Sequence, residues 1–260
     1  MAYNTVQYSE TRGIATITLN RADKRNAISY ELIDDLIAAL KQAANSTAQV
    51  VILTGAGKAF CSGMDLDNLK QLTGRTHEQN IQDSETMASL FRTLYDFPKP
   101  TIAAVNGPAI AGGTGLATLC DFTLAVPEAK FGYTEVRIGF MPAIVSSILV
   151  WQVGHKAARD LLISGRLFDA LEAQRLGLVN EVVAPEKLMD RARELAAQLL
   201  ENSPAAMRAT KKLLNGFIAA DLDQQIAEGI EENARQRTTA DFREGVSAFL
   251  EKRKPSWSTE

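Results

Sequence analysis

Short apolar runs alternate with stretches of helical periodicity in the first half of the chain. Val50–Leu53 is apolar throughout and Thr101–Val105 nearly so, as expected of buried strands. After Ser29, a good N-cap residue, apolar positions recur every three or four residues, which predicts a helix. The predicted strands are Thr5–Ser9, Ile14–Leu19, Val50–Leu53, Thr101–Val105 and Phe122–Val126, and the predicted helices follow Ser29, include Met87–Leu94 and span Gly112–Cys120.

The last third of the chain has almost only helical periodicity. Strands that alternate with helices indicate an α/β fold with crossover connections, and helices collected at one end form an appendage or an oligomer surface. We therefore expect an α/β core over residues 1–200 and a helical C-terminal region over 201–260. The helices predicted from Pro185 onward are Leu188–Leu200, Ala205–Phe217, Leu222–Arg237 and Thr239–Lys252.

The composition argues against several classes of protein. Of the 260 residues, 46% are apolar and 23% are charged, which argues against a disordered or collagen-like chain. The formal charge of −3 argues against a nucleic-acid partner. Cys61 and Cys120 lie far apart without CxxC spacing, so neither a disulfide framework nor a metal site is expected.

No segment has the pattern of a signal peptide or a membrane span. The N-terminal residues lack a basic segment followed by an apolar run. The longest uncharged stretches, Thr101–Cys120 and Ile138–His155, contain proline and polar residues, which favours buried core over a membrane span. We therefore expect a cytoplasmic protein without a membrane partner.

Few segments have the spacing of a catalytic motif. Gly55–Phe60 follows a strand, but its glycine spacing fits neither a dinucleotide fingerprint nor a phosphate-binding P-loop. The two histidines, His77 and His155, stand in no HExxH or Ser-His-Asp pattern. Acid–base chemistry therefore falls to carboxylates, Tyr, Lys or Cys.

A glycine-rich turn at Val105–Gly115 is the most informative stretch. It leaves a buried strand and enters a helix, whose first N–H groups have no partner within the helix. Glycine lets a ligand approach these groups closely, so the turn suits a phosphate or a developing oxyanion. A tight turn that only packs the helix is the alternative.

Segments spread over essentially the whole chain resemble the enoyl-CoA hydratase/isomerase (crotonase) superfamily in identity, order and spacing. The resemblance implies a ββα spiral core with a C-terminal helical trimerisation region, assembled as a homotrimer or a dimer of trimers. The pattern is closest to bacterial methylglutaconyl-CoA hydratase-like members. The matching segments are Phe60–Leu66, Val105–Gly113, Ala129–Gly139, Ser164–Arg166, Ala173–Asn180 and Phe249–Lys254, with Glu135–Ser146 carrying the closer likeness.

The resemblance implies an oxyanion hole made of the backbone N–H groups of Met64 and Gly112, which would stabilise the enolate of an acyl-CoA thioester. Hydratases of the family typically use two glutamates. Glu135 matches the second of these, whereas Gly115 stands at the position of the first. Burial of Glu135 in an apolar pocket would raise its pKa and make it a competent acid.

Hydration of a 2-enoyl-CoA thioester is the function that we expect, with Glu135 giving a proton to the α-carbon and orienting the water. The assisting group is a substrate carboxylate, an ordered water, Tyr133 or Asp121. A Δ3,Δ2-enoyl-CoA isomerase that uses Glu135 alone is one alternative, and a non-catalytic acyl-CoA-binding protein is another. The acyl pocket would come from loops such as Gln71–Gln82 and Phe140–Val145.

No permanently bound cofactor is implied, since the CoA thioester is the substrate. By the resemblance, Lys24 and Arg25 lie near the CoA phosphates, and Phe249 and Lys252 reach the CoA of a neighbouring subunit. The loop Ser62–Leu66 would hold adenine and pantetheine through backbone groups. The predicted substrate-binding residues are Lys24, Arg25, Ala27, Ser62, Gly63, Asp65, Leu66, Gly113, Phe249 and Lys252.

Overall fold

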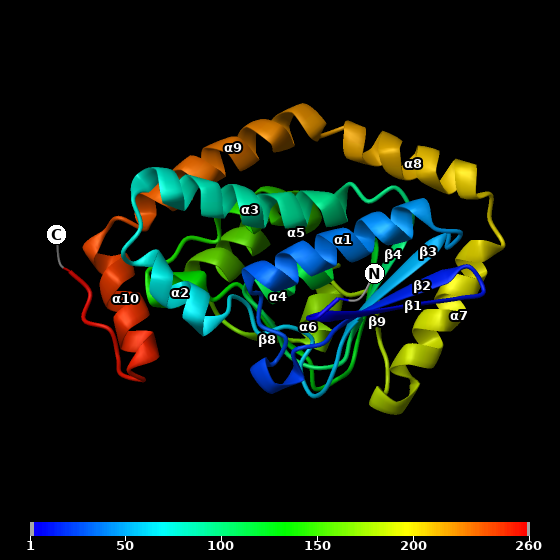
Figure 1. Ribbon diagram of the computed structural model, residues 1–260, viewed down its shortest axis with the longest axis horizontal. Helices are drawn as coiled ribbons and strands as arrows, with labels where there is room; N and C mark the ends of the chain where they lie inside the picture. The colour runs from blue at the N-terminus through cyan, green and yellow to red at the C-terminus, as the bar shows by residue number, and fades with distance from the viewer. Residues whose placement is uncertain (1–2, 259–260) are drawn as a thin grey trace.

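A computed structural model describes residues 3–258 and contains a six-stranded sheet at its centre (Figure 1). The first two strands form an antiparallel hairpin, and every later strand joins in parallel. Parallel neighbours require crossover connections, which helices supply. The strands lie in the order β1 (Val6–Thr11), β2 (Ile14–Leu19), β3 (Val50–Gly55), β4 (Thr101–Val105), β6 (Phe122–Ala125) and β9 (Glu181–Val182).

The middle of this sheet is buried completely. Every residue of β3 and of β4 is buried, which explains why their sequences are apolar runs without alternation. Helix α1 (Tyr30–Asn45) packs on β1 and β2, and α7 (Leu188–Leu200) packs on β3, β4 and β6. The predicted N-cap of α1 is confirmed, because the Ser29 hydroxyl accepts a hydrogen bond from Leu32 N at 3.2 Å.

A second, smaller sheet joins β5 (Ala109–Ile110), β7 (Lys130–Gly132) and β8 (Phe168–Asp169). Its strands are short, and Phe131 and Phe168 stack at 5.8 Å between ring centroids. Three short helices adjoin this sheet in the sequence. They are α4 (Gly112–Thr118), the 3₁₀ helix η2 (Glu135–Ile138) and α6 (Ala170–Arg175).

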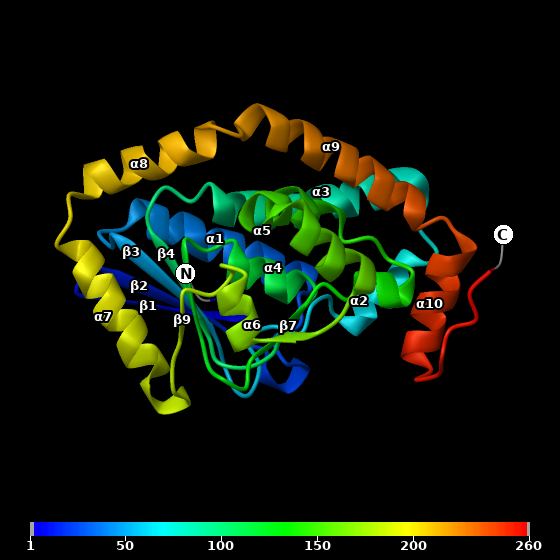
Figure 2. The ribbon, with the colours of Figure 1, turned by 180° about the vertical axis from the view of Figure 1, so that it is seen from behind.

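The C-terminal helices form an outer layer. In Figures 1 and 2, α8 (Pro204–Gly216) and α9 (Ala219–Gln236) make an arch over one side of the molecule, and α10 (Ala240–Leu250) lies at one end. Helix α9 packs on α3 (His77–Tyr95) and α5 (Ala143–Ser164), which lie beneath it, whereas α10 packs on η2 and α2 (Leu66–Leu72). Two further 3₁₀ helices are η1 (Ala22–Lys24) and η3 (Pro185–Lys187).

The predicted α/β class is confirmed, and each predicted strand and helix is present, although α3 begins at His77, ten residues before the predicted Met87–Leu94 segment. The pattern does not predict α5, because this helix is apolar on several sides and Gly154 interrupts it at φ 73°. The shortest strands, β5, β7, β8 and β9, also lack a sequence signal, since two or three residues define no period. None of the helices within residues 3–258 is both long enough and apolar enough to cross a bilayer.

Candidate active site

Two backbone segments that are far apart in the sequence lie side by side at the site. Cys61 pairs with Ala109 in an isolated parallel bridge. In this bridge Ile110 N donates to Cys61 O at 2.9 Å, and Cys61 N donates to Pro108 O at 3.2 Å. The segment before Met64 is thereby attached to the segment before Gly112.

Two glycines allow this close approach. A Cβ on Gly113 would stand 2.2 Å from Cys61 O, and a Cβ on Gly63 would stand 3.1 Å from Ile110 O. Gly63 also has φ +84°, a conformation that favours glycine. Gly63 and Gly113, both predicted binding residues, therefore allow the two segments to approach because they have no side chain. Neither residue lines the cavity described below.

The N–H groups of Met64 and Gly112 have no acceptor among residues 3–258. Gly112 is the first residue of α4, so no carbonyl of that helix can accept from its N–H. The preceding residue, Ala111, has φ 52° and ψ −123°, and its own N–H donates to Gly132 O at 2.7 Å. A non-glycine residue at positive φ is strained, and such strain gathers at functional sites. The two predicted oxyanion donors thus border one space with their N–H groups unpaired.

Glu135 starts η2 and borders the same space. Its Oε2 atom is buried and has no hydrogen-bond partner within the described part of the chain. Burial raises the pKa of Glu135 to about 7, and a hydrogen bond from its own backbone N–H offsets this only in part. The carboxyl group can therefore hold or release a proton near neutral pH.

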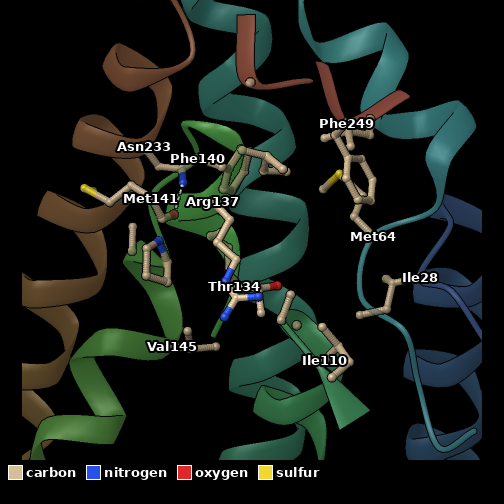
Figure 3. Close-up of a pocket in the computed structure, with 18 of the residues that line it drawn as sticks. Ile28, Met64, Ile110, Thr134, Arg137, Phe140, Met141, Val145, Asn233 and Phe249 are labelled. Carbon is tan, nitrogen blue, oxygen red and sulfur yellow. Dashed lines mark hydrogen bonds between the residues drawn. The ribbon is translucent and has the colours of Figure 1, made fainter. Parts of the chain in front are cut away.

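The space is a cavity of about 450 Å³ with mostly apolar walls. In Figure 3, Met64 and Ile28 stand on one side of the cavity and Met141 and Val145 on the other. The polar side chains that line it come from six residues besides Glu135, namely Ser62, Thr134, Arg137, Asn233, Arg237 and Arg253. Met64, Gly112 and Glu135 all line this one cavity, which joins the predicted oxyanion donors to the predicted acid.

No carboxylate can stand at residue 115 without rearrangement. A Cβ on Gly115 would lie 2.7 Å from Val145 Cγ1 and 3.3 Å from Phe91 Cζ. Both of these apolar side chains also line the cavity. Val145 and Phe91 thus fill the volume beside the position where hydratases of this type typically carry their first glutamate.

The two side chains suggested as helpers of Glu135 are engaged elsewhere. Asp121 Oδ2 accepts hydrogen bonds from Thr101 N at 2.8 Å and from Lys211 Nζ at 2.6 Å. The Tyr133 hydroxyl lies 3.2 Å from Thr118 Oγ1 in the core. Neither Asp121 nor Tyr133 lines the cavity.

The other predicted CoA residues between Lys24 and Leu66 differ in burial, and Ser62 is the one among them that lines the cavity. Lys24 and Arg25 are exposed, and Ala27 is buried. Asp65 is also buried, where it caps α2 through Asp67 N and pairs with Arg21. Ser62 lines the cavity, whereas Leu66 is 51% exposed at the start of α2.

Helix α10 reaches the cavity of its own chain. Phe249 lines this cavity, although the resemblance implies contact with a neighbouring subunit, and Lys252 is exposed beyond the helix. This packing is close because a Cβ on Gly245 would lie 2.3 Å from Ile138 C. The C-terminal region therefore covers the 3₁₀ helix that carries Glu135.

Several cavity residues were not predicted from the sequence. The wall takes Met87 and Phe91 from α3, whereas Phe140–Val145 line it as expected and Gln71–Gln82 do not. Arg237 is buried beside the cavity and pairs with Asp83 at 2.5 Å. A periodic apolar stripe identifies a helix face, but it does not indicate which cavity that face meets.

Other reactive groups lie outside the site's chemistry. Burial raises the pKa of both Cys61 and Cys120 to about 12, so both thiols stay protonated. Residues 3–258 contain no cluster of three or more His, Cys, Asp or Glu side chains suited to a metal ion.

Comparisons with known proteins agree with this geometry. A family model described as enoyl-CoA hydratase/isomerase matches residues 9–260. A Thermus thermophilus protein provisionally named an enoyl-CoA hydratase is 45% identical over 243 residues, which cover 93% of this chain and 96% of that protein. The short-chain-enoyl-CoA hydratase of Clostridium acetobutylicum is 34% identical, over 98% of this chain and 97% of that protein.

The fold comparison leads to the same group. The crystal structure of an enoyl-CoA hydratase/isomerase from Xanthobacter autotrophicus matches with a TM-score of 0.89 at 30% identity, over 96% of this chain and 97% of that one. This chain has the crotonase fold and belongs to the enoyl-CoA hydratase/isomerase family.

Proposed function

We propose that this chain is a hydro-lyase that adds water to the double bond of a 2-enoyl-CoA thioester. One observation carries the proposal: Met64, Gly112 and Glu135 line a single apolar cavity. The enoyl-CoA hydratase names of relatives at up to 45% identity support hydration over other reactions of the family. The closer likeness to methylglutaconyl-CoA hydratases stays a prediction.

The Met64 and Gly112 N–H groups would bind the thioester oxygen. Addition to a conjugated thioester places negative charge on this oxygen as the enolate develops. Two unpaired N–H groups in a water-poor cavity stabilise that charge without reorganising, and each is worth roughly 10²–10³-fold in rate. The carbonyl would lie between the segment at Met64 and the start of α4.

Glu135 would move the proton. Its protonated carboxyl gives a proton to the α-carbon, while the oxygen of a water forms the bond to the β-carbon. The carboxylate then accepts the proton that the attacking water loses, so one water is added and Glu135 returns to its starting form. With Val145 and Phe91 beside residue 115, a single carboxyl would serve both proton transfers.

The CoA moiety would bind at the edge of the cavity as substrate, with no permanently bound cofactor. Exposed Lys24 and Arg25 suit its phosphates, and the backbone of Ser62–Leu66 suits adenine and pantetheine. The substrate-binding set stays as predicted, with Gly63 and Gly113 acting through backbone geometry and Phe249 as part of the cavity wall.

The assembly would be a homotrimer or a dimer of trimers in the cytoplasm. Helix α8 has no buried residue, and Leu213, Leu214 and Phe217 at its end are each more than half exposed. An apolar face of this kind needs a cover, which another subunit would provide. The exposed apolar face supports the proposal that residues 201–260 form the oligomerisation region and residues 1–200 the α/β core. Residues 1, 2, 259 and 260 of these two ranges lie outside the described residues.

Separate incubations with a 2-enoyl-CoA and a 3-enoyl-CoA test the proposal. Formation of 3-hydroxyacyl-CoA from the 2-enoyl substrate, lost in Glu135→Gln, is the expected result. Migration of the double bond without uptake of solvent oxygen would instead identify an isomerase. Tight binding of both esters without turnover would identify a non-catalytic acyl-CoA-binding protein.

A further inference from the structure

The Arg21 side chain connects the two segments that flank the predicted CoA site. It follows β2 and is largely buried, with 19% of the side chain exposed. Its Nη2 lies 2.8 Å from Asp65 Oδ2, and its Nη1 donates to Ala27 O at 2.5 Å. One planar guanidinium therefore holds a carboxylate from one segment and a carbonyl from the other.

The residue that Arg21 holds comes directly after Met64. Asp65 N donates to Ile28 O at 2.9 Å, and Ile28 N donates to Gly63 O at 2.7 Å. Asp65 Oδ1 also accepts from Asp67 N at 2.9 Å, which caps α2. The peptide groups on both sides of Met64 are thus attached to Ile28, and Asp65 is attached to Arg21.

A second set of bonds fixes Arg21 itself. Asn26 is fully buried with φ 55°, and its Oδ1 accepts from Arg21 N at 2.9 Å. Its Nδ2 donates to Ala56 O at 2.9 Å and to Ala59 O at 2.8 Å. Every polar atom of the Asn26 amide is therefore used to hold the turn that carries Arg21 against the loop after β3.

The direction of the Met64 N–H depends on these contacts. Met64 N makes no bond of its own among residues 3–258, so only its neighbours hold its orientation. The Met64 N–H belongs to the peptide of Gly63 and Met64, whose carbonyl accepts from Ile28 N. Ile28 N in turn belongs to the peptide of Ala27 and Ile28, whose carbonyl accepts from Arg21 Nη1. Loss of Arg21 would release this carbonyl and would also leave Asp65, which is 4% exposed, buried without its cation.

We propose that Arg21 is a positioning residue that fixes the Met64 N–H in the direction of the thioester oxygen by clamping Asp65 to Ala27. This inference rests on the proposed function of that N–H. Arg21 does not line the cavity, so it acts through Ala27 and Asp65 and not by touching substrate. Lysine cannot replace it, since a single ammonium does not match two acceptors in the fixed geometry of a guanidinium.

The test compares Arg21→Met and Arg21→Lys with the unmodified protein in kcat, KM and ligand affinity. Two probes separate positioning from simple binding: acetoacetyl-CoA, whose enolate absorbs in the near ultraviolet, and butyryl-CoA, which cannot place a full charge on its carbonyl oxygen. Arg191→Met is the control, because Arg191 also forms a carboxylate pair at 2.9 Å, with the more exposed Glu181, and does not line the cavity.

We expect Arg21→Met to lower kcat by about ten- to a hundredfold, since small displacements of a preorganised group cost this much. In Arg21→Met the affinity for the acetoacetyl-CoA enolate should fall by a similar factor, whereas the affinity for butyryl-CoA should change less than about threefold. Arg21→Lys should recover little of the lost kcat or of the lost enolate affinity. Arg191→Met should leave all of these values unchanged.

Three outcomes would overturn the inference. If the unmodified protein is active and Arg21→Met has the same kcat, a positioning role for Arg21 is excluded. A raised KM with equal weakening of both probes assigns Arg21 to CoA binding instead. If Arg21→Met does not fold, Asp65→Asn replaces it as the test, because asparagine keeps an oxygen that can accept from Asp67 N. The inference fails unless this variant lowers both kcat and enolate affinity. Lack of hydration by the unmodified protein would instead contradict the proposed function.

Discussion

The two walls of the cavity are built by opposite means. On the carbonyl wall, the segments before Met64 and Gly112 are joined by backbone hydrogen bonds of 2.9 and 3.2 Å, and glycines permit their contact. On the acid wall, Glu135 Oε2 has no partner among residues 3–258, and its surroundings are mostly apolar. Both walls leave polar atoms unpaired, but backbone hydrogen bonds hold the first wall in place, whereas an apolar environment sets the properties of the second.

This difference teaches which changes each wall should tolerate. Backbone donors survive exchange of the side chain that carries them, provided that the chain keeps its path. A desolvated carboxyl depends on its own identity and on every apolar neighbour that excludes water. Variants of each wall, and of pH, can therefore separate the two contributions.

The largest effect is expected for Glu135→Gln. The amide cannot exchange a proton with the α-carbon, so kcat should fall roughly 10²–10⁴-fold. Steady-state hydration of a 2-enoyl-CoA measures this loss. Glu128→Gln, an exposed position in the same part of the chain, should keep full activity and serves as the control. Equal activity of both variants would remove Glu135 from the reaction.

A somewhat smaller loss is expected for Gly112→Pro, which deletes the N–H at the start of α4. Proline suits the first position of a helix, so removal of the donor is the main change, and kcat should fall roughly 10²–10³-fold. Gly112→Ala keeps the N–H, and its Cβ would stand 3.1 Å from the flexible end of Ile28. If the alanine variant loses as much activity as the proline variant, crowding and not donation explains the effect.

The acid wall should make stability depend on pH. The pKa of Glu135 is about 7 in the fold against a usual value of 4.5, so the native state binds more protons between these two values. The free energy of unfolding should therefore fall as pH rises through this window, by up to about 3 kcal/mol. Urea unfolding at pH 5 and pH 8 measures the difference, and Glu135→Gln should lose most of it.

Hydration and dehydration should respond to pH in the same way. In the proposed mechanism Glu135 begins and ends each turnover protonated, so by microscopic reversibility both directions start from the protonated carboxyl. The value of kcat/KM should therefore fall about tenfold per pH unit above the Glu135 pKa of about 7 in each direction. Steady-state profiles with a 2-enoyl-CoA and with its 3-hydroxyacyl-CoA measure this fall, and a rate that stays constant above that pKa would assign the proton transfers to another group.

The smallest effect is expected for Met64→Ala. The Met64 N–H remains, so kcat should change less than about tenfold, and mainly through the shape of the cavity wall that Met64 lines. A circular dichroism spectrum and kcat on one 2-enoyl-CoA suffice as measurements. A loss as large as that of Gly112→Pro in a folded variant would mean that the methionine side chain takes part.

Much of this molecule could be predicted from local pattern. Val50–Leu53 is a buried strand because its residues are apolar, and the turn at Val105–Gly115 shows its glycines directly in the sequence. The resemblance also pointed to Glu135, yet only the structure shows that its Oε2 lacks a partner. The helix η2 that carries this atom packs against α5 and α10, which no local window contains.

Other parts had no local signal. Arg21 and Asn26 stand in a polar stretch that resembles an ordinary exposed turn, and only their contacts to Asp65 and Ala56 reveal a function. Asp83 and Arg237 lie 154 positions apart, so neither residue predicts its partner. Long-range pairs of this kind follow from the path of α3 and α9 and not from propensity.

The packing around Gly115 also limits how this protein can change. Val145 belongs to α5 and Phe91 to α3, and both stand where a side chain at residue 115 would begin. A glutamate at residue 115 would therefore meet side chains from two helices at once, and shrinking either neighbour would open a void in the wall. Residue 115 is thus expected to change only together with its neighbours on α3 and α5.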